Sequence, residues 1–136
     1  MQTILLVDDE PPLLQLCLQI LRLGGYQVLP AGNAEEALQL LKDNATGVDL
    51  LLSDVVMPGM NGIDLAKRIQ DSHPHTRVAL MTGYDADEIT RLAGEHNPYR
   101  IIWKPFKTAS LLRMIENVLD SPAKADQANP KIDADL

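Results

Sequence analysis

The chain has 136 residues, of which 46% are hydrophobic and 23% charged, and its formal net charge is −7. This length and composition fit one globular domain with its own hydrophobic core and argue against a disordered chain. The acidic balance counts against direct binding to nucleic acid, which needs a basic surface. The one cysteine, Cys17, has no partner for an intrachain disulfide, and its apolar surroundings predict a buried side chain that packs as a small hydrophobe.

Neither a signal peptide nor a membrane helix is expected. Residues 1–3 run straight into an apolar segment without the basic region that opens a signal peptide. No apolar run approaches the roughly 20 residues that a membrane helix needs. We therefore expect a cytoplasmic protein without a membrane partner.

The N-terminal part of the chain predicts strand, helix and strand. Residues 3–7 form a short, nearly continuous apolar run, typical of a strand that is covered on both faces. Two prolines then open a helix over residues 11–23, and two glycines end it. Residues 27–31 give a second, weaker strand.

The middle of the chain repeats this alternation. Asn33 is the predicted N-cap of a helix to about residue 42, and Glu36 stands three residues later, as in a capping box. Residues 48–53 form an apolar third strand. A loop rich in Pro, Gly and Asn follows, and a helix is expected over about residues 63–70.

The C-terminal part continues with a fourth strand over residues 77–81. Asp85 and Glu88 suggest a capping box for a short helix to about residue 95, and residues 100–103 form a fifth strand. Thr108 is expected to cap the last helix, which carries one apolar stripe to about residue 119.

Five strands that alternate with five helices predict an α/β fold with a parallel sheet and helices on both of its faces. In such sheets, ligands bind beyond the carboxyl ends of the strands. The alternation stops after residue 120. Residues 1–120 are therefore expected to form the domain, and residues 121–136, with two prolines and scattered charges, a flexible tail or truncated linker.

Polar side chains follow the predicted strands at the end where ligands bind. Asp8 and Asp9 follow the first strand and Asp54 follows the third. Thr82 follows the fourth strand and Lys104 the fifth. If the first and third strands are adjacent, three carboxylates meet at one edge, with a hydroxyl and an ammonium beside them. An acid after a strand is often an ordinary loop residue, but five polar residues at the strand ends of one sheet are hard to obtain by chance.

Three clustered carboxylates repel one another, so they need a cation or a shared proton. Carboxylate oxygens suit Mg²⁺, which keeps several waters and also accepts phosphate oxygens. In this setting Asp54 can act as a nucleophile toward a phosphoryl group and form an acyl phosphate. Lys104 would then stabilise the charge on the phosphoryl oxygens, and the Thr82 hydroxyl could hydrogen-bond to the product.

Four sequence motifs resemble the receiver domains of two-component response regulators. They are ILLVDDE at 4–10, DVVMPGMNG at 54–62, MTG at 81–83 and KPF at 104–106. The resemblance covers roughly residues 3–120. It implies a flavodoxin-like, doubly wound, five-stranded parallel sheet of strand order 2-1-3-4-5 with five helices.

The resemblance also implies roles at the acidic cluster. Asp54 matches the phospho-acceptor, and Asp8 and Asp9 match the acidic pair that binds Mg²⁺ or Mn²⁺. Asp9 is expected to bind the metal directly and Asp8 largely through water. The backbone carbonyl of Val56 is expected to complete the metal site.

Further roles follow at the ends of the last two strands. Thr82 matches the switch hydroxyl, Gly83 the small residue beside it, and Lys104 the lysine that contacts phosphate. Pro105 matches a proline that in this family often follows a cis peptide bond, which proline tolerates far better than other residues.

One position departs from the family pattern. Many receivers place Tyr or Phe three residues before the lysine, where the ring turns inward on activation, whereas this chain has Ile101. Tyr99 and Trp103 flank Ile101 on the same face of the strand, and we expect all three to pack against the core or a helix. The phosphorylation chemistry is unaffected, but the usual threonine–aromatic switch lacks its aromatic partner.

The resemblance implies that the donor is a phosphohistidine on a sensor histidine kinase or a histidine phosphotransfer domain. This donor is expected to dock near the site and the first helix, where Pro11, Pro12, Leu14 and Gln15 are candidate contacts. The output is expected to leave through the fourth helix, fifth strand and last helix. The protein would be a monomer or weak dimer, and it would catalyse only its own phosphorylation and dephosphorylation.

Several alternatives remain at this point. The chain could be a stand-alone phosphorelay carrier, or a receiver cut from a hybrid histidine kinase or a larger regulator. A phosphatase with an Asp nucleophile commonly has a second Asp two residues later, where this chain has Val56. A flavin-binding protein would need small or hydroxyl residues after the first strand, where three acidic residues would repel a phosphate. A scaffold that no longer takes phosphate would not need the complete acceptor set.

Overall fold

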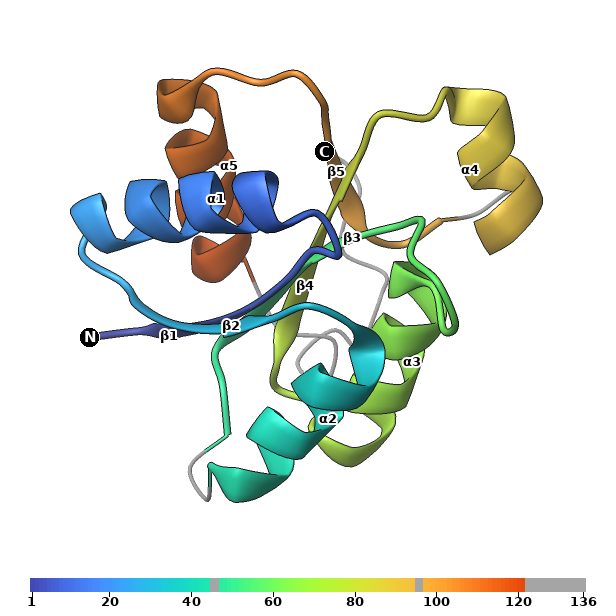
Figure 1. The fold of residues 1–136 in the computed structure, drawn as a ribbon. Helices are drawn as coiled ribbons and strands as arrows, with labels where there is room; N and C mark the ends of the chain where they lie inside the picture. Colours follow the sequence, from blue (N-terminus) through green and yellow to red (C-terminus); the bar gives the residue numbers. More distant parts are fainter. Residues whose placement is uncertain (45–46, 95–96, 122–136) are drawn as a thin grey trace.

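The computed structural model describes residues 1–44, 47–94 and 97–121 and shows one sheet between two layers of helices (Figure 1). The five strands and five helices in these residues follow the predicted alternation. In chain order they are β1 (Thr3–Val7), α1 (Pro11–Leu23), β2 (Gln27–Ala31), α2 (Ala34–Asp43), β3 (Leu50–Asp54), α3 (Gly62–Ser72), β4 (Arg77–Thr82), α4 (Ala86–Ala93), β5 (Arg100–Trp103) and α5 (Thr108–Asp120).

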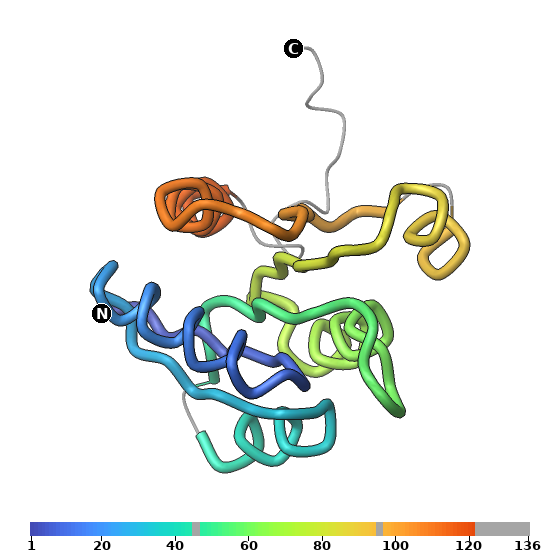
Figure 2. Tube along the Cα trace, turned by 45° about the horizontal axis from the view of Figure 1, so that its top comes forward, coloured from blue at the N-terminus to red at the C-terminus, as the bar shows by residue number. Residues whose placement is uncertain are grey.

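The strands are all parallel and lie in the order β2-β1-β3-β4-β5. The predicted flavodoxin-like topology is therefore confirmed. Helices α1 and α5 cover one face of the sheet, and α2, α3 and α4 lie over the other. Figures 1 and 2 both place α4 at the opposite side of the molecule from α1.

The central strands are buried on both faces, as their continuous apolar sequences predict. In β1, Ile4 and Leu6 point into the core beneath α1 and α5, whereas Leu5 and Val7 point into the core beneath α2 and α3. All four side chains are fully buried. Two apolar layers thus fix the register of β1 between its neighbours, and that register fixes the place of the acidic residues that follow it.

Side chains at the helix starts confirm two of the three predicted caps. Asn33 Oδ1 accepts a hydrogen bond from the Glu36 N–H at 2.8 Å, and Asp85 Oδ1 accepts one from the Glu88 N–H at 2.9 Å. The third cap was wrong. Thr108 is the first residue of α5, which is preceded by Lys107 without a side-chain cap.

Some element boundaries differ from the predictions. The third strand covers Leu50–Asp54 instead of residues 48–53, and α3 is longer than expected at both ends. Asp54 and Thr82 are consequently the last residues of β3 and β4 rather than the first residues after them. Helix α4 ends at Ala93 because Gly94 adopts a φ of 86°, which leaves the helical conformation.

Three predictions at the chain ends and on β5 have different outcomes. Of the expected tail, only Ser121 lies within the described residues. Tyr99 and Ile101 are half-buried and pack against the core as expected. Trp103, in contrast, is 43% exposed, because it is the last residue of an edge strand with only one neighbouring strand to cover it.

The predicted interior position of Cys17 is confirmed. Its side chain is 2% exposed and lies 4.0 Å, sulfur to sulfur, from Met81 on β4. Burial raises the pKa of the Cys17 thiol to about 11, and the nearby carboxylate of Asp8 adds to this effect. Since the reactive species is the thiolate, a thiol with this pKa is inert at neutral pH.

Candidate functional site

The acidic residues lie at the carboxyl ends of two adjacent strands. Asp8 directly follows β1 and Asp54 ends β3, and these strands pair in parallel. Asp8 is fully buried and Asp54 is 7% exposed, whereas Asp9 is the least buried of the three acids. The carboxylate oxygens of Asp8, Asp9 and Asp54 can all lie within 4.8 Å of one another. The convergence predicted from the strand ends is thus present.

Backbone contacts hold Asp8 at this edge. Its N–H donates to the Ala31 carbonyl at 3.1 Å, and its Oδ1 accepts from the Glu10 N–H at 2.9 Å. The second contact uses a buried carboxylate to satisfy a backbone donor at the start of α1. Asp8 therefore has a fixed orientation before any ligand arrives.

Lys104 reaches the same cluster from the end of β5. Its Nζ lies 3.3 Å from Asp8 Oδ2 and 3.3 Å from Asp54 Oδ2. Burial alone would lower the pKa of Lys104, but the two carboxylates together raise it above its ordinary value. The ammonium is thus charged and neutralises part of the acidic cluster.

Burial dominates the titration of Asp54. It raises the pKa of this carboxyl from 3.8 to about 6, with Lys104 opposing the shift and Asp8 adding to it. Near neutral pH the group is ionised, but it is held in surroundings that disfavour its charge. A further cation beside this carboxylate would offset part of the cost of burying its charge.

The donor set suits a hard divalent cation. Three carboxylates beside one ammonium leave two net negative charges, and all available side-chain donors to a metal are oxygens. Mg²⁺ binds such sites through one or two carboxylates and keeps waters in its remaining positions. The residues present therefore fit the predicted ion. Val56 lines the same open pocket as Asp9 and Asp54.

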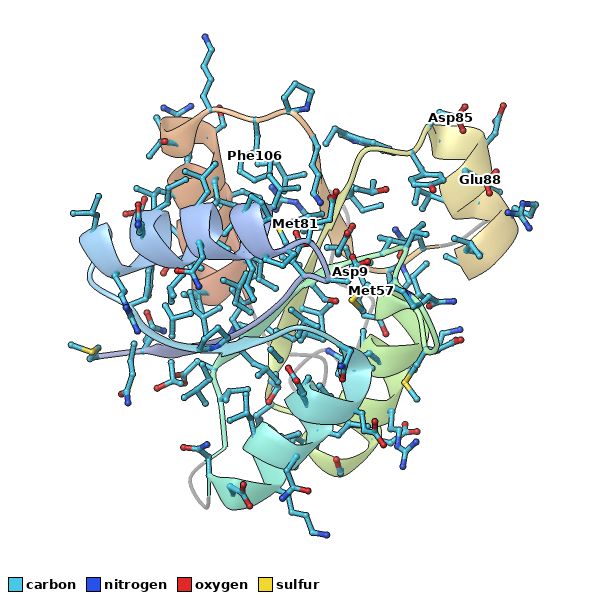
Figure 3. All side chains as sticks on the ribbon, viewed as in Figure 1. Asp9, Met57, Met81, Asp85, Glu88 and Phe106 are labelled. Carbon is cyan, nitrogen blue, oxygen red and sulfur yellow. The ribbon has the colours of Figure 1, made fainter. Side chains whose placement is uncertain are left out.

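This pocket has an acidic floor and a partly apolar wall. Met57 and Tyr84 form parts of the wall beside Asp54 and Lys104. Figure 3 shows Asp9 and Met57 close together at the end of the sheet. The sequence alone did not predict that Tyr84 lines the pocket. Its position two residues after Thr82 is the only signal that could have found it.

Thr82 is fully buried at the end of β4 and bound to the loop that follows. Its Oγ1 accepts a hydrogen bond from the Tyr84 N–H at 3.0 Å. Its carbonyl accepts one from the Lys104 N–H at 2.7 Å, which joins the ends of β4 and β5. Gly83 lies between these contacts, and a Cβ added there would meet the Lys104 Cβ at 3.9 Å, an ordinary contact.

The loop after Asp54 is fixed by a close backbone approach that sequence reasoning also missed. The Gly62 N–H donates to the Val55 carbonyl at 2.8 Å, and Ser53 Oγ donates to the Asp54 carbonyl at 2.8 Å. A Cβ added at Gly62 would lie 2.1 Å from the Asp54 carbonyl oxygen, so only glycine fits. The signal was the glycine just before the predicted helix start, where the neighbouring Asn61 caps α3 through the Asp64 N–H.

Comparison with known proteins identifies the family. The family model for the response regulator receiver domain matches residues 4–116. The chain belongs to this family. The receiver resembles the transcriptional regulatory protein CpxR of Escherichia coli K12, with 34% identity over 143 residues that cover 99% of this chain and 59% of CpxR. It also resembles the sensor kinase CckA of Brucella abortus, with 30% identity over 118 residues, 87% of this chain and 12% of CckA.

Solved structures agree with this result. A CheY-like response regulator receiver domain protein from Methanospirillum hungatei JF-1 has a TM-score of 0.78 and 30% identity, covering 88% of this chain and 94% of that one. The receiver spans about three fifths of the length of CpxR. Within its described residues, no helix combines the length and apolarity that crossing a membrane would require.

The receiver also has the predicted cis peptide bond, between Lys104 and Pro105. One of the four candidate donor contacts on α1 is less accessible than the others. Pro11, Pro12 and Gln15 are exposed, but Leu14 is half-buried because it packs against the core beneath α1. Leu16 is instead the exposed apolar residue of this stretch, at 50%.

Proposed function

We propose that this receiver accepts a phosphoryl group on Asp54 from a phosphohistidine of a partner protein, with Mg²⁺ or Mn²⁺ as its cofactor, and signals by a change of shape. The observation that carries the proposal is the position of Asp54. Its carboxylate is nearly buried at the floor of an open pocket, between Asp8 and the Lys104 ammonium. Membership of the receiver family supports the same reading.

In the proposed transfer, an Asp54 carboxylate oxygen attacks phosphorus while the bond from phosphorus to the imidazole nitrogen breaks. The electron pair of that bond stays on the imidazole, and an acyl phosphate forms on Asp54. The raised pKa of Asp54, about 6, still lies below neutral pH, so the group is mostly ionised there, as a nucleophile must be. Its buried surroundings disfavour the charge, and the phosphoryl group adds further negative charge, so Lys104 and a bound cation would have to offset both.

A bound Mg²⁺ would supply positive charge to the carboxylates and to the phosphoryl oxygens. Asp9, Asp54 and the carbonyl of Val56 are the proposed direct ligands, with Asp8 acting largely through water. The accessibility of Asp9 supports its assignment as a direct ligand. The contact between Asp8 and the Glu10 N–H leaves Oδ2 of Asp8 as the oxygen that faces Lys104.

Lys104 and Thr82 are proposed to read the phosphoryl group. Lys104 now shares its ammonium between Asp8 and Asp54, and it can turn to a phosphoryl oxygen once Asp54 is modified. The Thr82 oxygen accepts from the Tyr84 N–H, which leaves the hydroxyl hydrogen available for donation. Movement of Thr82 toward phosphate would therefore pull on the loop that leads to α4.

The proposed switch includes Gly83 and Ile101 as well as Thr82. Gly83 leaves space beside Lys104. Ile101 on β5 pairs with Leu80 on β4, two residues before Thr82. Within Ala86–Ala93, all of which the structure describes, Ile89 is the one buried residue. A helix with a single buried anchor can shift at modest cost. We propose that α4, β5 and α5 form the output face.

The donor is proposed to dock over the pocket and the start of α1. Pro11 and Pro12 follow Glu10, which lines the pocket, and Gln15 and Leu16 continue the exposed surface by one turn. Two of the relatives, the regulator CpxR and the sensor kinase CckA, are longer proteins than this chain. We propose that residues 1–120 form a complete receiver unit, either in a stand-alone relay protein or as one module of such a longer chain.

The test uses Trp103, the single tryptophan of the chain. Mg²⁺ is added first, and then beryllofluoride or a small phosphodonor, while tryptophan fluorescence and intact mass are recorded. We expect an Mg²⁺-dependent fluorescence response with either reagent, and one added phosphoryl group with the phosphodonor. Asp54→Asn should abolish both. Asp64→Asn, the same change at an exposed residue of α3, should retain them. Phosphorylation of the Asp54→Asn variant would show that the acceptor is a different residue.

A further inference from the structure

The C-terminal end of α5 lacks a cation of its own. The final carbonyls of a helix have no partners within the helix and carry its negative dipole end, where basic side chains are favourable. The last turn of α5 contains no basic residue. Glu116 and Asp120 instead add negative charge there. From its own sequence, this end should fray.

Arg77 provides the missing cation from another element. Its Nε donates a hydrogen bond to the Ser121 carbonyl at 2.8 Å, across 44 positions of sequence and in a partly buried setting. Ser121 is the residue that follows α5. Arg77 begins β4, so this contact lies at the opposite end of the parallel strands from Asp8 and Asp54, which lie at their carboxyl ends. A hydrogen bond from a charged donor is among the stronger ones.

Both partners of this contact are held in place. Arg77 begins β4, and its N–H donates to the Asp49 carbonyl at 3.0 Å. On the other side, the Ser121 N–H donates to the Val118 carbonyl at 3.1 Å and its Oγ donates to the Asn117 carbonyl at 2.8 Å. The guanidinium therefore joins an anchored strand to an ordered helix end, rather than to a freely moving loop.

We propose that Arg77 is a positioning residue that holds the last turn of α5 against the start of β4 and thereby fixes the position of Ser121, the residue that follows the last helix. The last turn also carries Val118 and Leu119, each 5% exposed in the core beneath α1 and α5. Loss of the Arg77 contact would loosen this part of the core. Arg77 and Thr82 are the first and last residues of β4, so the Arg77 contact connects the end of α5 to the strand that carries the proposed switch hydroxyl.

The test is hydrogen exchange measured along the chain in wild type, Arg77→Ala and Arg77→Met. Methionine keeps much of the aliphatic stem and removes the guanidinium. We expect both variants to raise exchange at residues 118–121 by at least about tenfold, since a charged hydrogen bond of about 1.5 kcal/mol or more is lost. Exchange in β1 and β3 should change much less.

Arg113→Ala is the matched control, because it removes an exposed cation from α5 itself without touching Ser121. It should leave exchange at residues 118–121 within about threefold of wild type, as most surface substitutions have small effects. An equal rise across all strands and helices in the Arg77 variants would show general destabilisation and overturn the proposal. Wild-type protection in Arg77→Met would also overturn it, since packing of the stem would then be sufficient.

Discussion

Asp54→Asn should make the metal-free protein more stable near neutral pH, although it removes the proposed reactive group. Asparagine keeps the shape of the side chain and removes the charge. The wild-type carboxylate is 7% exposed and lies beside Asp8, and its burial is the main reason for its raised pKa. In the unfolded chain the same carboxylate is hydrated. Ionised Asp54 therefore opposes folding.

The size of the effect follows from the two pKa values. The difference between 3.8 and about 6, at 1.36 kcal/mol for each pKa unit, corresponds to about 3 kcal/mol. This value already includes the opposing contact with Lys104 at 3.3 Å, and it is an upper limit because the asparagine amide must find hydrogen bonds in the same buried place. We expect Asp54→Asn to be more stable than wild type by about 1–3 kcal/mol near pH 8.

The pH dependence fixes the sign of this expectation. The folded protein holds the Asp54 proton more tightly than the unfolded chain does, so the resulting stability is present below about pH 4 and is lost as pH rises through about 6. The advantage of Asp54→Asn should thus be small near pH 4, grow between about pH 4 and 6, and stay constant above about pH 7. Urea unfolding of both proteins across this range, without divalent metal, measures it.

The control is Asp64→Asn, an identical change at an exposed residue in the first turn of α3. It should slightly destabilise the protein, because an acid near a helix N-terminus is favourable. Equal or lower stability of Asp54→Asn near pH 8 would refute the reasoning that burial dominates at Asp54. So would a stability difference that does not depend on pH.

Four further substitutions, of which Gly83→Ala is a control, test other parts of the receiver. Gly62→Ala should lower the free energy of unfolding by several kcal/mol, because its Cβ would lie 2.1 Å from the Asp54 carbonyl oxygen. Gly83→Ala should be nearly as stable as wild type, because its Cβ would make an ordinary contact. The urea midpoints of the two variants test this difference. Lys104→Met should lower the thermal midpoint without Mg²⁺ and increase the stabilisation that Mg²⁺ gives, because Asp8 and Asp54 lose their shared cation; an unchanged Mg²⁺ effect would contradict this. Tyr99→Phe should lower the free energy of unfolding in urea by about 1 kcal/mol, because the hydroxyl donates to Gln70 Oε1 at 3.3 Å. A decrease much above about 2 kcal/mol would contradict this, because more than one hydrogen bond would then have been lost.

The fold could be predicted because its signals are local. Continuous apolar runs marked the strands with both faces covered, and Asn33 and Asp85 marked two helix starts at the correct residues. The parallel arrangement then placed polar residues from four strands at one edge. Strand order required the family resemblance, because the alternation of strands and helices alone is compatible with other orders.

The missed features depend on contacts between distant residues. The contact from Arg77 to Ser121 joins residues 44 positions apart, and no pattern in either segment indicates it. Trp103 was expected to pack against the core or a helix because it lies on the same face of the strand as Ile101, but alternation only selects a face of the sheet. Whether that face is covered depends on the neighbouring strand and helix, which are set by the tertiary fold.

The exposed position of Trp103 bears on how the signal leaves the site. Trp103 pairs in register with Thr82, and the Lys104 N–H that follows it donates to the Thr82 carbonyl. Thr82 is bound on its other side to the Tyr84 N–H, and Tyr84 is 48% exposed. Any movement of Thr82 toward the pocket must therefore strain the backbone contacts to Tyr84 and Lys104. If Thr82 is the switch hydroxyl, as proposed, the surroundings of the exposed rings of Tyr84 and Trp103 should change on phosphorylation, even though Ile101 has no ring to turn inward.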